Sequence, residues 1–122
     1  GTLYASKNGK EPKKVGEISV SASYYNSYSR ISEDGKTFYF FKNIVDNYTP
    51  YGDLYKYSYG SKPEKVATDV MVYTFNSYKT RGINPKSFVY QQYTGQKDYD
   101  TLGDLFYYNG SKSTKIATDV RY

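Results

Sequence analysis

One short stretch occurs three times along the chain and constrains its fold more than any other feature. The copies begin at Gly1, Gly52 and Gly103, so each copy lies 51 residues from the next. The second copy reads GDLYKYSYGSKPEKVATDV and the third GDLFYYNGSKSTKIATDV, whereas the first, GTLYASKNGKEPKKVGEI, is more divergent. A self-similarity with a period of about 50 residues is typical of propellers and stacked repeat arrays. The repeat therefore predicts an architecture before any single motif is considered.

The amino-acid composition predicts a folded β-protein. Hydrophobic residues make up only 38% of the chain, and the mean hydropathy of −0.81 suggests a polar sequence. However, 18 Tyr and 6 Phe raise the aromatic fraction to 20%. Tyrosine buries a large ring while its hydroxyl stays hydrated, and strands favour it. With 122 residues, the chain has room for one domain or part of one.

Strand patterns divide the repeat into four segments. We expect strands at residues 20–26, 36–42, 52–58 and 64–70, and again at residues 71–77, 87–93, 104–108 and 115–120. No segment has a convincing helical period, so the predicted fold class is all-β. In the strand expected at residues 36–42, apolar side chains lie on both faces, which predicts burial of both faces.

Two of the predicted strands open the chain, and glycines close the hairpins. Residues 2–6 and 13–18 are joined through Asn8-Gly9, a strong hairpin signal. Gly60 and Gly110 end the corresponding strands in the later copies, and we expect both to have positive φ, where a Cβ would be strained.

Four antiparallel strands in a repeat of this length are typical of a β-propeller blade. On this interpretation residues 1–18 are the outer hairpin of a partial blade, and residues 19–70 and 71–122 are complete blades. We call these the first, second and third units. Because closed propellers need about four to eight blades, about two and a half blades predict a fragment of a larger propeller. The expected partners are then the remaining blades of a longer parent chain, or further copies of this one.

Segments of the second unit resemble a known family. Residues 32–40 (SEDGKTFYF), 53–57 (DLYKY) and 62–66 (KPEKV) resemble the TolB-type, WD40-like blade, whose pattern is S-P-D-G-K-x-I-x-F, then D-I-Y-x-x-D, then G-x-x-x-x-L-T. Glu33 replaces the usual proline, and Asn84-Pro85 replaces Asp-Gly in the third unit. The whole chain is similar to propeller-repeat surface proteins of gut Firmicutes. The resemblance implies blade architecture and a bacterial, extracellular or cell-surface location, and it implies no particular activity.

The residue types exclude several kinds of catalysis. The chain has no His and no Cys, which excludes Ser-His-Asp and Cys-His nucleophiles and the usual zinc ligand sets. The acids Asp53, Asp104, Asp69 and Asp119 recur with the repeat, which favours local structural roles over a catalytic pair. We therefore expect no catalytic residue and no cofactor in this chain.

Two loop carboxylates are weak candidates for metal binding. Asp98 and Asp100 could donate oxygen atoms to Ca²⁺. They lack the glycine and the ligand spacing of a dedicated calcium loop, so no metal site is expected.

Aromatic residues at the start of each unit are the best signal for ligand binding. They lie on or just beyond the first predicted strand, which would line a propeller channel: Tyr24, Tyr25, Tyr28, Tyr73, Phe75 and Tyr78. Tyrosine offers a rigid, amphipathic contact for sugar rings or peptides. Packing between neighbouring units is the alternative role.

The basic charge gives little support for nucleic-acid binding. Lys and Arg number 17 against 12 Asp and Glu, but the lysines follow the recurring hairpins, where they protect exposed strands from pairing with other chains. No apolar run approaches the roughly 20 residues of a membrane span.

Two functions remain open. One is a non-catalytic extracellular recognition or scaffold module that binds protein or glycan, and the other is the propeller portion of a larger hydrolase whose catalytic residues lie elsewhere.

Overall fold

The computed structural model describes residues 1–18, 30–32, 34–45, 49–75 and 87–121 of the chain. These residues form the strands β1 (Thr2–Ala5), β2 (Lys13–Glu17), β3 (Arg30–Ile31), β4 (Thr37–Val45), β5 (Tyr51–Ser58), β6 (Glu64–Met71), β7 (Phe88–Lys97), β8 (Asp100–Tyr108) and β9 (Ser113–Arg121). A single helical turn, α1 (Val72–Phe75), follows β6. The described part of the chain is therefore all-β in character, as the sequence predicts.

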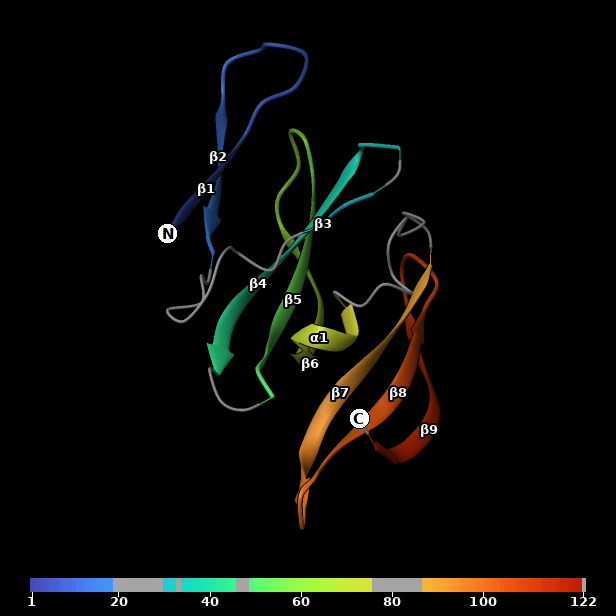
Figure 1. Ribbon diagram of the computed structural model, residues 1–122. Helices are drawn as coiled ribbons and strands as arrows, with labels where there is room; N and C mark the ends of the chain where they lie inside the picture. Colours follow the sequence, from blue (N-terminus) through green and yellow to red (C-terminus); the bar gives the residue numbers. More distant parts are fainter. Residues whose placement is uncertain (19–29, 33, 46–48, 76–86, 122) are drawn as a thin grey trace.

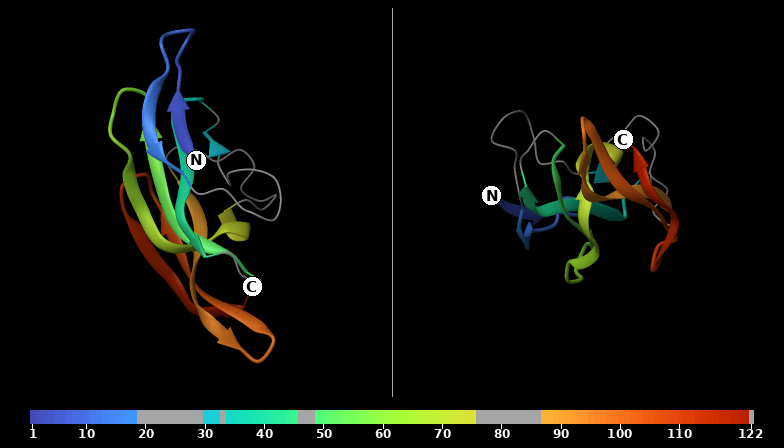
Figure 2. Two further views of the ribbon diagram at one scale, coloured as in Figure 1. Left: turned by 90° about the vertical axis from the view of Figure 1, so that its left-hand side faces the viewer. Right: turned by 90° about the horizontal axis from the view of Figure 1, so that it is seen from below.

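The strands are connected in simple antiparallel order. β1 and β2 form a hairpin of their own, whereas β3 to β9 form a seven-stranded sheet in chain order (Figure 1). In the described residues, β6 and β7 are joined by one residue pair, Val70 with Gln92. The large sheet thus consists of two meanders, β3 to β6 and β7 to β9, and it curls into a half-barrel (Figure 2).

The sequence repeat reappears as a repeated irregularity of the backbone. In each unit the register of the hairpin shifts at the same place, so Val15, Val66 and Ile116 have no residue opposite them on the paired strand. An extra residue of this kind bends the strand and increases its twist. The three hairpins therefore share one local shape, and side chains at equivalent positions point the same way.

Strand β4 is buried on both faces, as its alternating aromatic residues predict. Tyr39 and Phe41 belong to a hydrophobic cluster that includes residues of the third unit. Phe40 belongs to a second cluster, which includes residues of the β1–β2 hairpin. The second unit accordingly lies between the first and the third (Figure 1).

The two clusters are built from equivalent positions of the repeat. One combines aliphatic residues of the first unit with aromatic residues of the second: Leu3, Ala5, Val15 and Ile18 with Phe38, Phe40, Tyr55 and Tyr57. The other combines residues of the second and third units: Leu54, Val66, Ala67 and Val70 with Phe88, Tyr90, Phe106 and Tyr108. The four aromatic residues match those of the first cluster in the repeat, and Leu54 and Val66 match Leu3 and Val15. The second unit also contributes Tyr39 and Phe41 to its cluster with the third unit. The side of a unit that packs against the aromatic residues of the next unit is here called its leading face.

The recurring glycine permits a close approach of two strands at the start of the second and third copies. A Cβ atom on Gly52 would lie 3.0 Å from the carbonyl oxygen of Lys42 on β4, and one on Gly103 would lie 2.8 Å from that of Gln92 on β7. Any larger residue would push the paired strands apart. The glycine that marks the repeat in the sequence is therefore a packing requirement.

The prediction of a strand over residues 71–77 is wrong for residues 72–75, which form α1. Val70, Met71 and Val72 are consecutive and fully buried, whereas successive side chains of a strand point to opposite faces. The backbone N–H of Val72 donates to the carbonyl oxygen of Pro50 at 3.0 Å, which ties the departing chain to the start of β5. The third unit accordingly has three strands in its described part, and the strand predicted at residues 20–26 lies outside the described residues.

A short strand also replaces part of a predicted loop. Arg30 and Ile31 form β3, paired with β4. The connecting turn is closed by Ser32, whose backbone N–H donates to the carbonyl oxygen of Thr37 at 2.8 Å. The sequence signal was missed because two residues are too few to show an alternating pattern.

Candidate functional site

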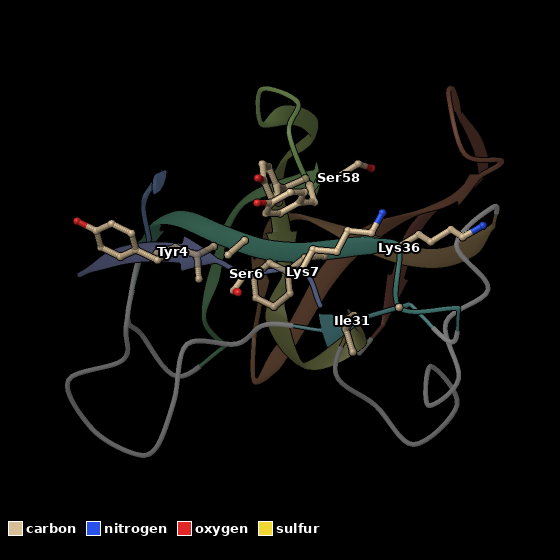
Figure 3. A pocket seen from close by; sticks show the side chains of 12 residues that line it. Tyr4, Ser6, Lys7, Ile31, Lys36 and Ser58 are labelled. Carbon is tan, nitrogen blue, oxygen red and sulfur yellow. The ribbon is translucent and has the colours of Figure 1, made fainter. Parts of the chain in front are cut away.

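A pocket of about 570 Å³ opens between the β1–β2 hairpin and the adjoining part of the large sheet (Figure 3). Tyr4 lies at one end of this pocket and Lys36 at the other. Its lining comes from β1 and the residues after it, from β3, and from β4 and β5 with their turns: Leu3, Tyr4, Ala5, Ser6, Lys7, Ile31, Gly35, Lys36, Phe38, Tyr57, Ser58 and Tyr59. The pocket thus combines aromatic walls with a polar rim.

The aromatic rings of the pocket are held by contacts of their own. Phe38 stacks beside Phe40, with 6.2 Å between the ring centroids. The hydroxyl of Tyr57 accepts a hydrogen bond from the backbone N–H of Gly60 at 3.1 Å. The hydroxyl of Tyr59 donates to the carbonyl oxygen of Glu11 at 3.3 Å. Because these contacts restrain the rings before anything binds, the pocket is largely preformed.

The charged groups among the pocket-lining residues are lysines. Lys7 and Lys36 are exposed at the rim. The nearest acid in sequence, Asp34, uses its carboxylate within its own turn, where it accepts hydrogen bonds from the Ser32 hydroxyl at 2.6 Å and the Lys36 backbone N–H at 2.9 Å. The Ser32 bond, followed by that of Lys36, holds the pKa of Asp34 below its ordinary value. The charged side chains that line the pocket are therefore cationic and suit a ligand with acidic groups, and the ionised Asp34 carboxylate near Lys36 offsets part of their charge.

Of the predicted ligand-binding aromatics, the structure describes Tyr73 and the backbone of Phe75. Tyr24, Tyr25, Tyr28 and Tyr78 lie outside the described residues. Tyr73 is on α1 with 42% of its surface exposed. Phe75 ends α1, and its side chain is outside the described part. Tyr73 is not among the residues that line the pocket.

The two weak metal candidates lie at the tip of the β7–β8 hairpin, away from the pocket. Asp98 occupies the turn with φ 56°, and the carboxylate of Asp100 forms an ion pair with Arg121 at 3.2 Å. Within the described residues, no three acidic, histidine or cysteine side chains gather in a way that could hold a metal ion.

The predicted binding residues all lie on or beside the first predicted strand of a unit, so the pocket residues were missed. Phe38 and Tyr57 correspond to Phe88 and Tyr108, and the repeat therefore indicates the same core role for both pairs.

Comparison of the chain with protein-family models, with curated proteins and with solved structures finds no match. Among the described residues, no helix has the length and apolar character needed to cross a membrane.

Proposed function

We propose that this chain is a non-catalytic recognition or scaffold module, made of propeller-type repeat units, that binds protein or glycan at the bacterial cell surface or outside the cell. The observation that carries the proposal is the preformed aromatic pocket with its lysine rim. Aromatic rings with hydrated edges suit both sugar rings and peptide side chains. The cell-surface location follows from the resemblance to propeller-repeat surface proteins alone.

The propeller interpretation is supported by the way in which the units contact one another. Equivalent aliphatic and aromatic residues meet at both unit interfaces, and the hairpins share one bulge. A repeat array is expected to reuse one interface in this manner. In the part of the chain that the structure describes, β6 and β7 share one residue pair, which is also consistent with meanders that act as separate blades.

A ligand titration tests the recognition function. We expect amide signals of residues around Tyr4 and Phe38 to shift in NMR spectra when a binding oligosaccharide or an acidic peptide is added. Tyr4 is 59% exposed and lines the pocket, so Tyr4→Ala should weaken binding without affecting the core.

The matched control is Tyr99→Ala. Tyr99 is fully exposed at the tip of the β7–β8 hairpin, distant from the pocket in the fold. Equal binding by the wild type and Tyr4→Ala, or equal losses in both variants, would contradict a ligand site at the pocket.

A further inference from the structure

We infer that the pocket and the outer edge of β1 together form an acceptor site for one further β-strand, whose side chains follow the pattern of Thr37–Phe41. The inference rests on the proposed recognition function and deepens it, because it names the kind of segment that fills the pocket. The occupant is a partner segment in extended conformation with alternating aromatic side chains.

The first argument is the unpaired edge of β1. In the second unit, β5 pairs with β4 on one side and with β6 on the other. β1 stands at the equivalent position of the first unit, yet among the described residues it pairs with β2 alone. An edge strand presents a row of backbone N–H and C=O groups that can template another strand.

The second argument is the position of the pocket. In the second unit, the ring of Tyr39 meets Phe88 edge to face, with 5.3 Å between the centroids, and it shares its cluster with Tyr108. The repeat equivalents of Phe88 and Tyr108 are Phe38 and Tyr57, and both line the pocket. At the interface of the second and third units, the ring of Tyr39 fills this position. At the interface of the first and second units, the same position is the pocket.

The burial of Tyr39 shows how closely such a ring is enclosed. Tyr39 has no exposed surface, and this burial, followed by the proximity of Tyr108 and Asp34, raises the pKa of its phenol to about 12. An aromatic residue that enters the pocket would be enclosed in the same way.

The third argument is register. Tyr39 lies opposite Lys56, and Phe41 lies opposite Leu54. The equivalents of Lys56 and Leu54 on β1 are residues 5 and 3, an alanine and a leucine, and both also line the pocket. A strand that paired with β1 in the register of β4 with β5 would direct its corresponding side chains into the pocket.

The fourth argument is the glycine at the start of the first unit. At Gly52 and Gly103, the direction of a Cβ is occupied by a carbonyl oxygen of β4 or β7. At Gly1 the nearest described atom in that direction is Cγ2 of Ile18, at 4.0 Å. A strand at the inferred position would lie close to Gly1, as β4 lies close to Gly52 and β7 to Gly103.

Charge and continuity support the same occupant. The site extends the interface that already joins the β1–β2 hairpin to β4 and β5. A strand antiparallel to β1 would begin beside Lys7, which lies just beyond the end of β1. In the second unit the segment before β4 carries Asp34, so an acid in that place would face the positive rim.

The direct test adds the strand in the connectivity that the repeat uses. A second copy of residues 34–51 is placed immediately before Gly1, because residue 51 precedes Gly52 in the same way. We expect the thermal midpoint to rise by about 4 °C or more and amide hydrogen exchange in β1 to slow at least about tenfold. An extension that changes neither quantity would overturn the inference.

A matched extension carries alanine at the tyrosine of the added copy that corresponds to Tyr39. It should lose most of the gain, because it restores backbone pairing without filling the pocket. A capped peptide of residues 34–42 provides a second probe, and its saturable binding should shift the amide signals of Leu3 and Phe38. If the alanine extension stabilises as much as the parent extension, the pocket is not the acceptor.

Other occupants have distinct outcomes. Binding of a soluble oligosaccharide in the pocket, with no effect of the added strand, would overturn the inference and leave the proposed recognition function in place. Docking of the strand, with no glycan or acidic peptide bound by the unextended chain, would support the inference and contradict recognition of those ligands. If the unextended chain self-associates and this association protects the β1 amides from exchange, the site binds a second copy of the chain. That result would overturn the inference of a separate partner segment.

Discussion

The carboxylate of Asp104 accepts a hydrogen bond from the backbone N–H of Asp119, with 3.0 Å between oxygen and nitrogen. Asp53 and Asp69 form the same contact in the second unit, at 3.4 Å. Asp69 and Asp119 have φ of 52° and 51°, a left-handed conformation that costs a non-glycine residue energy and that the contact helps to offset. The recurring acids are therefore parts of the hairpin backbone, which is the structural role that their repetition predicts.

The contact of Asp104 should make part of the free energy of unfolding depend on pH in the acidic range. The hydrogen bond from Asp119, together with the Lys115 ammonium at 3.0 Å, holds the pKa of Asp104 below its ordinary value of 3.8. Because the folded pKa is lower than the unfolded pKa, the ionised carboxylate stabilises the fold above about pH 4, and this contribution is lost as the pH falls through the folded pKa. Urea unfolding at about pH 7 and about pH 3 should show a smaller loss of stability for Asp104→Asn than for the wild type.

Asp98→Asn is the matched control for this measurement. Asp98 also has positive φ, which asparagine tolerates, and it lies at the exposed hairpin tip. Its pH dependence should follow that of the wild type. Parallel pH profiles for the wild type and Asp104→Asn would contradict the assigned role.

Much of the fold could be predicted because the repeat and the strand alternation act locally. The hairpins and the burial of both faces of β4 follow from sequence patterns that span only a few residues. Helix α1 could not be predicted, since it depends on the simultaneous burial of Val70, Met71 and Val72 and on a contact with Pro50. Those are tertiary conditions that no local pattern records.

The candidate site was less predictable than the fold. The pocket arises where the first and second units meet, and its rings, such as Phe38 and Tyr57, are core residues at the equivalent positions of the next unit. A sequence that repeats indicates the same role for both copies. Only the arrangement of strands in space shows that one pair of aromatic residues is covered and that the other lies beside a pocket.

Gly60 offers a test of the hairpin geometry. Gly60 and Gly110 have φ of 86° and 106°, which confirms the predicted positive values. The Cβ direction of Gly60 is free of described atoms within 4 Å, so the cost of a side chain there comes from the backbone conformation. Gly60→Val should lower the free energy of unfolding by about 1 kcal/mol or more.

Gly60→Asn separates conformation from side-chain bulk, since asparagine tolerates the left-handed region. In chemical denaturation it should cost clearly less than Gly60→Val. Equal losses for the two variants would show that something other than positive φ determines the effect.

Lys56 links the second and third units. Its ammonium lies 2.6 Å from the hydroxyl of Tyr108 and 2.8 Å from the carbonyl oxygen of Gly110, which that hydroxyl also contacts at 2.7 Å. Lys56→Met should destabilise the fold by about 1–2 kcal/mol, because both oxygen atoms lose a charged donor. A double-mutant cycle with Tyr108→Phe should give a coupling energy of about 0.5–1.5 kcal/mol.

A surface lysine provides the comparison for this cycle. Lys65 lies 3.7 Å from Asp53, and 46% of its side chain is exposed, so solvent screens the ion pair and Lys65→Met should cost less than about 1 kcal/mol. A coupling near zero between Lys56 and Tyr108 would contradict a role for this hydrogen bond in holding the two units together.

The leading face of the third unit should drive self-association or leave the chain only marginally stable. Val89 and Ile116 are 44% and 56% exposed. Their equivalents in the second unit, Tyr39 and Val66, pack in the cluster that joins it to the third unit. Exposed apolar side chains at a repeated interface are expected to find a partner surface. Sedimentation velocity at increasing concentration should therefore show association of the wild type, and Ile116→Lys should suppress it.

Val45→Lys is the control for this change, because Val45 is similarly exposed, at 45%, but lies at the end of β4. It introduces the same charge, so a general effect of net charge on solubility would appear in both variants. Loss of association in Ile116→Lys alone would locate the contact on the leading face. A wild type that stays monomeric at millimolar concentration and is highly stable would instead show that the curled sheet is complete without a further unit.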